Sequence, residues 1–266
     1  MLAVAASAVV AALLLMDAAP GAGQVGRNAD PRRAARRPNL TGIWQAINTA
    51  NWNLEPHAAH AGSSQLGALG AIPAGLGVVD GDVIPYLPAA LEKRNRNFEK
   101  RWTDDPEIKC YMPGVPRATY MPFPFHIVQG AETILIAYEF ASASRTIHLD
   151  RPQKAPADSW MGTSNGRWEG DSLVVDVTGL GDQTWLDRAG NFHSDALHVV
   201  ERYTPAGADR LIYEATIDDP KVLAHPWKIR MPLYRRAEKD AQLLEFKCVP
   251  FSEELLYGHL RRKPSQ

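Results

Sequence analysis

The chain has 266 residues, 45% hydrophobic and 22% charged, a composition that can bury a core and that excludes a wholly disordered protein. Its 29 basic and 30 acidic residues give a formal net charge of −1, which argues against a general electrostatic attraction to nucleic acid or to an anionic membrane. Two cysteines are too few for a small disulfide-rich scaffold or a four-cysteine zinc site. The 20 glycines and 20 prolines indicate many turns and therefore many short strands.

The N-terminus carries the pattern of an export signal. Residues 2–16 form an apolar run of mostly Ala, Val and Leu, and the small-residue stretch 18–23 follows shortly after. This order predicts a secretory signal over residues 1–23, although no Lys or Arg precedes the apolar run. The run is shorter than the roughly 20 residues of a transmembrane helix, so we predict a periplasmic or secreted protein without a membrane span. Residues 24–39 are expected to form a flexible arm, and residues 40–266 a single domain.

Export would place the two cysteines in an oxidising compartment. We therefore expect a disulfide between Cys110 and Cys248, which would close a long loop. Such a loop stabilises a fold by about 4–5 kcal/mol if the effect is entropic. The alternative is two buried free thiols, and neither cysteine has neighbours that suggest a nucleophile.

The first half of the domain contains little periodic sequence. Residues 40–45 have the composition of a first strand, and residues 57–90 are rich in Gly, Ala and Pro, which indicates a long surface loop. Residues 88–102 are the one good helix candidate, because Pro88 lies near the first turn and an apolar stripe that includes Phe98 follows.

From about residue 125 onward, apolar and polar residues alternate with the period of strands that bury one face. The expected strands cover 133–140, 145–149, 167–168, 173–177, 197–204, 210–218, 227–236 and 242–249. Six or more successive antiparallel strands favour a closed barrel, because closure removes exposed sheet edges. We therefore predict a mainly β protein, built as an antiparallel barrel with one or two helices and long loops.

Two parts of the sequence resemble known families. Gly42-Ile43-Trp44 in the first expected strand is similar to the Gly-x-Trp of lipocalins, in which the Trp closes one barrel end, and this likeness implies a calycin-like fold. Residues 159–176, which contain GRWEGDSLVVD, resemble a family of exported bacterial proteins that are mostly hypothetical. The same resemblance extends to the segments 110–117, 201–203 and 218–220, and it implies a periplasmic setting without a catalytic assignment.

Standard catalytic and cofactor motifs are absent from the sequence. It has no Gly-rich phosphate loop, no Gly-x-Ser-x-Gly elbow, no His-Glu-x-x-His and no Cys-x-x-Cys. Any enzymatic chemistry is therefore expected to need neither a cofactor nor a metal, and to depend on acids, bases and aromatic side chains that lie on strands.

The strongest acid–base candidate is Glu201. If Tyr203 faces Leu211 across a hairpin, then Glu201 faces Tyr213 on a strand face that is otherwise apolar. Apolar surroundings favour the protonated form of a carboxyl group. A Tyr hydroxyl beside such a group makes a workable acid–base pair.

A second candidate pair lies on the preceding hairpin. If Phe140 faces Arg145, then Glu139 and His148 lie diagonally on one strand face, within reach of each other's side chains. A Glu in this place could fix the imidazole tautomer and leave the other ring nitrogen free as a base. His126 follows an apolar segment and is a further candidate for ligand contact, although a histidine in that setting is more often part of the core.

Both pairs also have a structural interpretation. Glu201 would then be buried in an ion pair, with Arg202 or Arg145 as the nearest partners in sequence. Glu139 and His148 would then form a pair that faces solvent.

The connection over residues 179–195 is long enough to be a lid or a binding loop. Trp185 could cover a barrel mouth, and Asp187 or His193 could reach a ligand. The alternative is a surface loop that Trp185 and Phe192 pack against the domain.

These residues predict a barrel whose mouth or interior holds a small, largely apolar or aromatic molecule. Aromatic side chains such as Tyr138 and Trp168 would line the cavity. As an enzyme, the protein would be a cofactor-independent lyase, isomerase or cyclase in which Glu201 or His148 moves a proton and Tyr213 donates to a developing oxyanion. The alternatives are a non-catalytic carrier of a hydrophobic molecule and a structural or interaction protein of the cell envelope.

Overall fold

A computed structural model describes residues 37–61 and 71–260 of the chain. The predicted signal sequence over residues 1–23 lies outside this part, as does the predicted arm except for its last three residues. Within the described part, no helix is long and apolar enough to cross a membrane.

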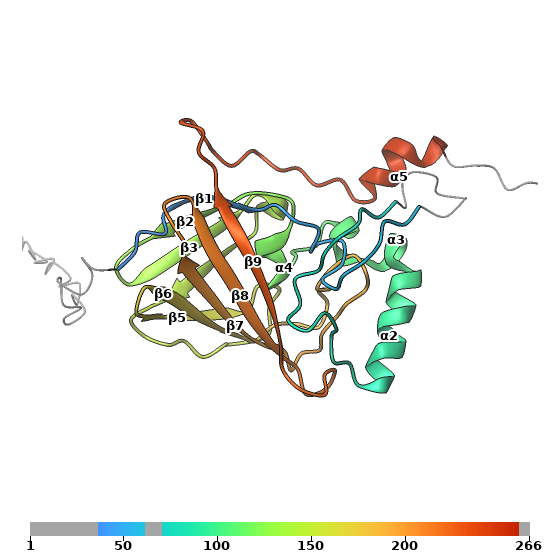
Figure 1. The fold of residues 1–266 in the computed structure, drawn as a ribbon, viewed down its shortest axis with the longest axis horizontal. Helices are drawn as coiled ribbons and strands as arrows, with labels where there is room; N and C mark the ends of the chain where they lie inside the picture. The colour runs from blue at the N-terminus through green and yellow to red at the C-terminus, as the bar shows by residue number, and fades with distance from the viewer. Residues whose placement is uncertain (1–36, 62–70, 261–266) are drawn as a thin grey trace, which may run out of the picture. The chain divides into compact units, whose positions relative to one another are not determined.

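The described residues form a closed barrel in which consecutive strands are neighbours and the last strand pairs with the first (Figure 1). The strands are β1 (Gly42–Ala46), β2 (Phe125–Gln129), β3 (Thr133–Tyr138), β4 (Ser144–His148), β5 (Thr163–Glu169), β6 (Ser172–Thr178), β7 (His198–Pro205), β8 (Arg210–Asp218) and β9 (Trp227–Arg235). Neighbouring strands are antiparallel except for β4 and β5, which run parallel. The predicted mainly β, calycin-like barrel with long loops is therefore confirmed, with one parallel pair that the sequence did not predict.

Strict alternation along the strands explains why they close around a core. In β7 the buried side chains are Val199, Glu201 and Tyr203, and in β8 they include Tyr213 and Ala215. These residues lie on the face that the period of two predicted to be buried. Side chains from the other strands fill the remaining interior, so the barrel is a packed core.

The register of the β7–β8 hairpin differs from the predicted one by two residues. Glu201 pairs with Ala215 and Tyr203 pairs with Tyr213, because β7 continues further and the turn after Ala206 is shorter than assumed. A shift by two residues leaves every side chain on its predicted face, since side chains alternate along a strand with a period of two.

Short helices accompany the strands. They are α2 (Pro88–Glu99), α3 (Arg101–Asp104), α4 (Arg117–Tyr120) and α5 (Ser252–Tyr257), with short 3-10 turns at Pro106–Lys109, Phe140–Ser142 and Gly258–Leu260. The helix predicted over 88–102 is confirmed, with a break at Lys100 between α2 and α3.

One predicted strand is wrong. Residues 242–249 form no strand, so β9 has no hairpin partner after it in sequence. The free edge of β9 is instead paired with β1, where Trp44 lies opposite Arg235. Closure of the barrel through β1 explains why the alternation over 242–249 does not produce another strand.

Trp44 is buried in the barrel, as expected for the Gly-x-Trp segment. Its indole N–H donates to the carbonyl oxygen of Leu40 at 2.9 Å. The guanidinium of Arg235 lies over the indole, 4.2 Å from the ring centroid.

Candidate functional site

Five polar side chains meet inside the barrel and form the central polar cluster: Tyr138, Arg145, Glu201, Tyr203 and Tyr213. They come from β3, β4, β7 and β8, and all are buried. Arg145 donates to both carboxylate oxygens of Glu201, at 2.6 and 2.9 Å, in a bidentate ion pair. Tyr203 and Tyr213 donate to the same carboxylate at 2.9 and 2.8 Å. The Arg145 guanidinium also donates to the hydroxyls of Tyr138 and Tyr203, at 3.0 Å each.

The structural interpretation of Glu201 is confirmed in this cluster. Of the two partners considered, Arg145 holds Glu201, while Arg202 pairs with Glu169 near the surface. The acid–base hypothesis assumed apolar surroundings for Glu201. The surroundings are polar, because a guanidinium and two tyrosine hydroxyls contact its carboxylate. The catalytic roles of Glu201 and Tyr213 stay predictions.

Burial and charge set the protonation of the central polar cluster. Burial raises the pKa of Tyr203 and of Tyr213, and the neighbouring Glu201 carboxylate raises each further. Burial alone would lower the pKa of Arg145, but the Glu201 carboxylate outweighs this effect and holds that pKa well above its usual value. The two tyrosines therefore stay protonated donors at neutral pH, and Arg145 stays charged.

A groove of about 470 Å³ lies between β4 and β5 and borders this cluster. The two strands share only two residue pairs, at the end of β4 and the start of β5. Arg145, His148 and Ser164 line the groove, and Arg145 donates to the Ser164 hydroxyl at 3.4 Å. The groove offers an approach toward the cluster, although the side chains of Arg145 and Glu201 are only 2% and 0% exposed.

The predicted pair of Glu139 and His148 does not form. The turn after β3 lies two residues earlier in the sequence than assumed, over residues 139–142, so His148 pairs with Thr133 at the opposite end of β3. Along an extended strand, Thr133 and Glu139 are about 20 Å apart. Glu139 accepts instead from the backbone N–H of Leu244 at 2.8 Å.

Two other predicted ligand-contact residues, His126 and Trp168, lie apart from the central polar cluster. His126 is half-buried between the two buried residues Phe125 and Ile127, so it lies on the outward face of β2. Trp168 is half-buried in β5, and its indole nitrogen has no hydrogen-bond partner among residues 37–61 and 71–260. The structure therefore does not bring these two residues together with the cluster.

Residues 179–195 form a largely buried connection, and the role of a lid or a binding loop stays a prediction. Trp185, Asp187 and His193 are all buried. Trp185 and Phe192 pair in an isolated antiparallel β-bridge. Both side chains belong to the hydrophobic core, in agreement with the alternative that they pack the loop against the domain. The burial of both aromatic side chains makes this segment part of the core.

Asp187 and His193 both have hydrogen-bond partners in this core. Asp187 accepts from the backbone N–H of Leu54 at 2.9 Å, and burial raises the pKa of Asp187 to about 6 against the opposing effect of its hydrogen bonds. His193 shares hydrogen bonds with the Thr184 hydroxyl at 2.5 Å and with the Ser194 carbonyl at 2.9 Å. Burial lowers the pKa of His193, so the ring is neutral at neutral pH.

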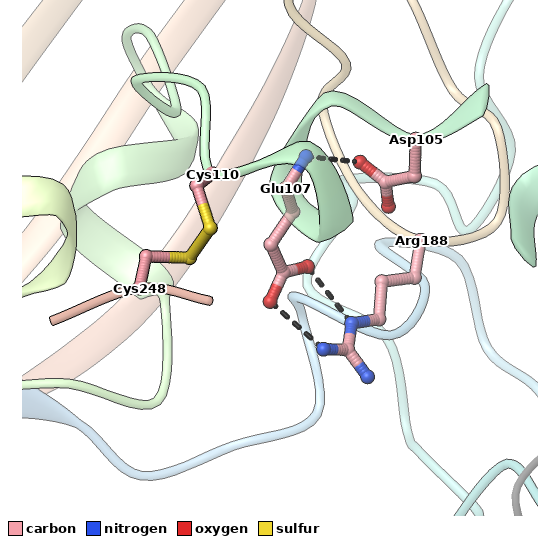
Figure 2. Close-up of a disulfide and its surroundings, with 5 residues drawn as sticks. All are labelled: Asp105, Glu107, Cys110, Arg188 and Cys248. Carbon is pink, nitrogen blue, oxygen red and sulfur yellow. Dashed lines mark hydrogen bonds and ion pairs between the residues drawn. A yellow bond between two sulfur atoms is a disulfide. The ribbon is translucent and has the colours of Figure 1, made fainter. Parts of the chain in front are cut away.

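Sequence reasoning missed a second buried cluster, in which Arg117 binds Asp105, Glu107 and Asn51. Arg117 donates to both oxygens of Asp105 at 2.9 and 3.1 Å, to Glu107 at 2.5 Å and to Asn51 at 2.9 Å. Glu107 also accepts two hydrogen bonds from Arg188, at 2.8 and 2.9 Å (Figure 2). Burial alone would raise the pKa of Glu107, but the guanidinium groups of Arg188 and Arg117 lower it to about 2.

The predicted disulfide between Cys110 and Cys248 is confirmed, with Cα atoms 5.6 Å apart. Figure 2 shows it beside Glu107. It attaches the C-terminal residues 236–260, which we call the tail, to the chain around the second buried cluster. The tail leaves β9 and runs without a strand to α5 (Figure 1).

A pocket of about 280 Å³, the tail pocket, lies between the tail and the residues it crosses. The ring of Phe246 in the tail lies 4.9 Å from that of Phe123 and 5.0 Å from that of Phe140, centroid to centroid. These three rings make an aromatic wall. Glu107 and Arg188, which pair with each other, add a charged edge to the lining, and Ser252 and Glu254 of the tail are its other polar members.

Comparisons with known proteins add no assignment. No family model matches the sequence, and no match to a curated protein was found. In the part of the chain that the structure describes, no three His, Cys, Asp or Glu side chains gather in a way that could hold a metal ion.

Proposed function

We propose that the protein is an exported carrier that binds a small, largely apolar or aromatic molecule in the tail pocket. The observation that supports this proposal is the aromatic wall of Phe123, Phe140 and Phe246 around a space of about 280 Å³. Ligand pockets combine a mostly apolar lining with a few polar groups, and their volumes begin at roughly 300 Å³. The tail pocket lies near that lower limit, so the ligand would be small.

The composition of the lining determines how such a ligand would be oriented. Aromatic faces and edges favour a planar or aromatic body at offset-stacked or edge-on geometry. The paired Glu107 and Arg188 would face the ligand at one edge, where a hydroxyl, carbonyl or amide group could form a hydrogen bond. We therefore expect a ligand with an apolar body and one polar end.

The test is binding of the neutral aromatic fluorophore N-phenyl-1-naphthylamine, followed by fluorescence. The oxidised protein should bind the probe saturably, and Phe246→Ala should raise its Kd at least tenfold because the variant removes one side of the aromatic wall. Leu244→Ala is the matched control, since Leu244 belongs to the same tail but its side chain is 66% exposed. Equal affinity of the two variants, or no saturable binding by the wild type, would overturn the proposal.

An acid–base enzyme is the second candidate, and the groove between β4 and β5 is the observation that favours it. The groove is lined by Arg145, His148 and Ser164, so a molecule bound there would lie next to the central polar cluster. Native mass spectrometry of protein purified from its own host would identify a co-purifying compound. Its turnover by Glu201→Gln and His148→Ala would then be measured. Unchanged turnover in both variants would eliminate this mechanism.

A further inference from the structure

We infer that the Cys110–Cys248 disulfide controls the tail pocket, so that reduction releases the tail and with it the bound molecule. This inference rests on the function proposed above, because it assigns a regulation to the same pocket. It would make the protein a carrier that holds its ligand under oxidising conditions and releases it to a thiol reductant.

The tail pocket is built from the tail and from earlier parts of the chain that meet it only on folding. One side comes from Arg188 and from residues between Trp102 and Phe140, including Ile108 and Phe123. The other side comes from the tail, including Phe246, Cys248, Val249 and Phe251. Displacement of the tail would therefore remove one whole side of the pocket.

The tail is held to the barrel by few regular contacts. Between the end of β9 and the start of α5 it has neither strand nor helix, and most of its side chains are exposed. At the start of the tail the backbone N–H of Arg236 donates to the Ile43 carbonyl of the barrel. Further along, the N–H of Leu244 donates to the Glu139 carboxylate and that of Phe251 to the Ile108 carbonyl, all at 2.8 Å. Val249, next to the disulfide, is 51% exposed. Segments with few buried contacts open at low free energy, so a covalent link matters here more than in the barrel.

The disulfide lies at the edge of the tail pocket, so breaking or reforming it would change the pocket directly. Cys248 lines the pocket, two residues from Phe246. Both Cys110 and Cys248 are half-buried, so the bond is not enclosed in the core. While the bond is intact, the tail residues beside it stay at a high effective concentration next to their partners. Without it, the one covalent attachment of the tail to the barrel is the chain that leaves β9, and weak contacts alone hold the tail against the pocket.

The chemical step is ordinary thiol–disulfide exchange with a dithiol reductant. A thiolate of the reductant attacks one sulfur of the Cys110–Cys248 bond, that bond breaks, and a mixed disulfide forms while the other cysteine leaves as a thiolate. The second thiol of the reductant then attacks the mixed disulfide and releases the first cysteine. The protein gains two electrons and two protons as two thiols, and the reductant becomes a disulfide.

The experiment compares oxidised protein with protein reduced by dithiothreitol, using N-phenyl-1-naphthylamine as the probe. Reduction should raise the Kd of the probe at least tenfold, and reoxidation should restore it. Hydrogen exchange should accelerate at residues 244–251 and stay unchanged in β7 and β8. The Cys110→Ser/Cys248→Ser variant should resemble the reduced protein with or without dithiothreitol, which separates loss of the bond from other effects of the reductant.

Each outcome decides between the two proposals. Equal probe affinity before and after reduction would contradict the inference that the disulfide controls binding, and it would leave the proposed carrier function unaffected. Failure of the oxidised protein to bind the probe would overturn the carrier function, and the control would fall with it. Faster exchange in β7 and β8 on reduction would show that the bond holds the whole fold, which also contradicts a control specific to the pocket.

Discussion

Replacing Glu201 with glutamine isolates the charge at the centre of the barrel. The substitution keeps the size of the side chain, but it removes the carboxylate that accepts two hydrogen bonds from Arg145 and one each from Tyr203 and Tyr213. Arg145, whose side chain is 2% exposed, would be left as a buried cation without its counter-charge. Where the amide N–H of the glutamine faces Arg145, it would meet a guanidinium, which donates and cannot accept.

The expected loss follows from the cost of an unpaired buried charge. Breaking a buried ion pair by removing one partner costs about 3–5 kcal/mol. Removing both charges should cost less than the sum of the single changes, because the double variant Arg145→Met/Glu201→Gln leaves no buried ion. We expect a coupling free energy of at least about 2 kcal/mol, within the range of contacting residues. The double variant should still have a lower free energy of unfolding than the wild type, because the tyrosine hydroxyls lose a hydrogen-bond partner.

Urea unfolding followed by circular dichroism measures these free energies, provided that the dependence on urea keeps the same slope in all variants. The matched control is Glu214→Gln on the outer face of β8. Glu214 lies 3.6 Å from Arg230 in an exposed pair and should lose less than about 1 kcal/mol. A loss below about 1 kcal/mol for Glu201→Gln, or single effects that add within about 0.5 kcal/mol, would refute the assignment of the cluster as a buried, charged network.

Three further outcomes are expected. The pKa of Glu107 is lowered to about 2 from an ordinary 4.5. This shift should add about 3 kcal/mol to the free energy of unfolding above pH 4.5, and the contribution should be lost as the pH falls toward 2. The stabilities of the wild type and of Glu107→Gln, measured in urea, should converge over that range, and parallel pH curves would contradict this. Gly114→Ala should cost at least about 2 kcal/mol, because Gly114 has φ +72° and an added Cβ would lie 2.7 Å from the Thr184 hydroxyl. Gly170→Ala is its control, since Gly170 also has a positive φ but open space around it. Burial lowers the pKa of His193, so by NMR its ring should titrate at a lower pH than an exposed histidine, and titration at or above 6.5 would contradict the effect of burial.

The buried faces of the strands could be predicted because they depend only on local alternation. The alternation along the two strands predicts that Glu201, Tyr203 and Tyr213 lie on one inward face, and the structure confirms it. The pairing of these residues was wrong by two positions, since the register depends on how tightly the turn closes. For Glu139 the predicted contact with His148 is wrong, because the turn after β3 lies two residues earlier in the sequence than assumed.

The second buried cluster shows why some of the site was missed. Arg117 ends the segment 110–117 that carries a family resemblance, and this was the one sequence signal for its importance. Its partners Asp105 and Glu107 lie in a stretch without strand or helix periodicity. A charged residue in such a stretch is normally expected at the surface, so only the folded chain shows that it is buried.

The sequence by itself determined the mainly β class, the helix after Pro88, the inward strand faces and the Cys110–Cys248 pair, because each depends on local period, turn residues or the cysteine count. Only the tertiary structure decided that Arg145 and not Arg202 neutralises Glu201. It also decided that residues 242–249 form one side of a pocket instead of a strand, since β1 had already paired with the edge of β9. These outcomes depend on contacts between distant segments, and no local pattern specifies which of several compatible partners a strand edge or a buried charge will meet.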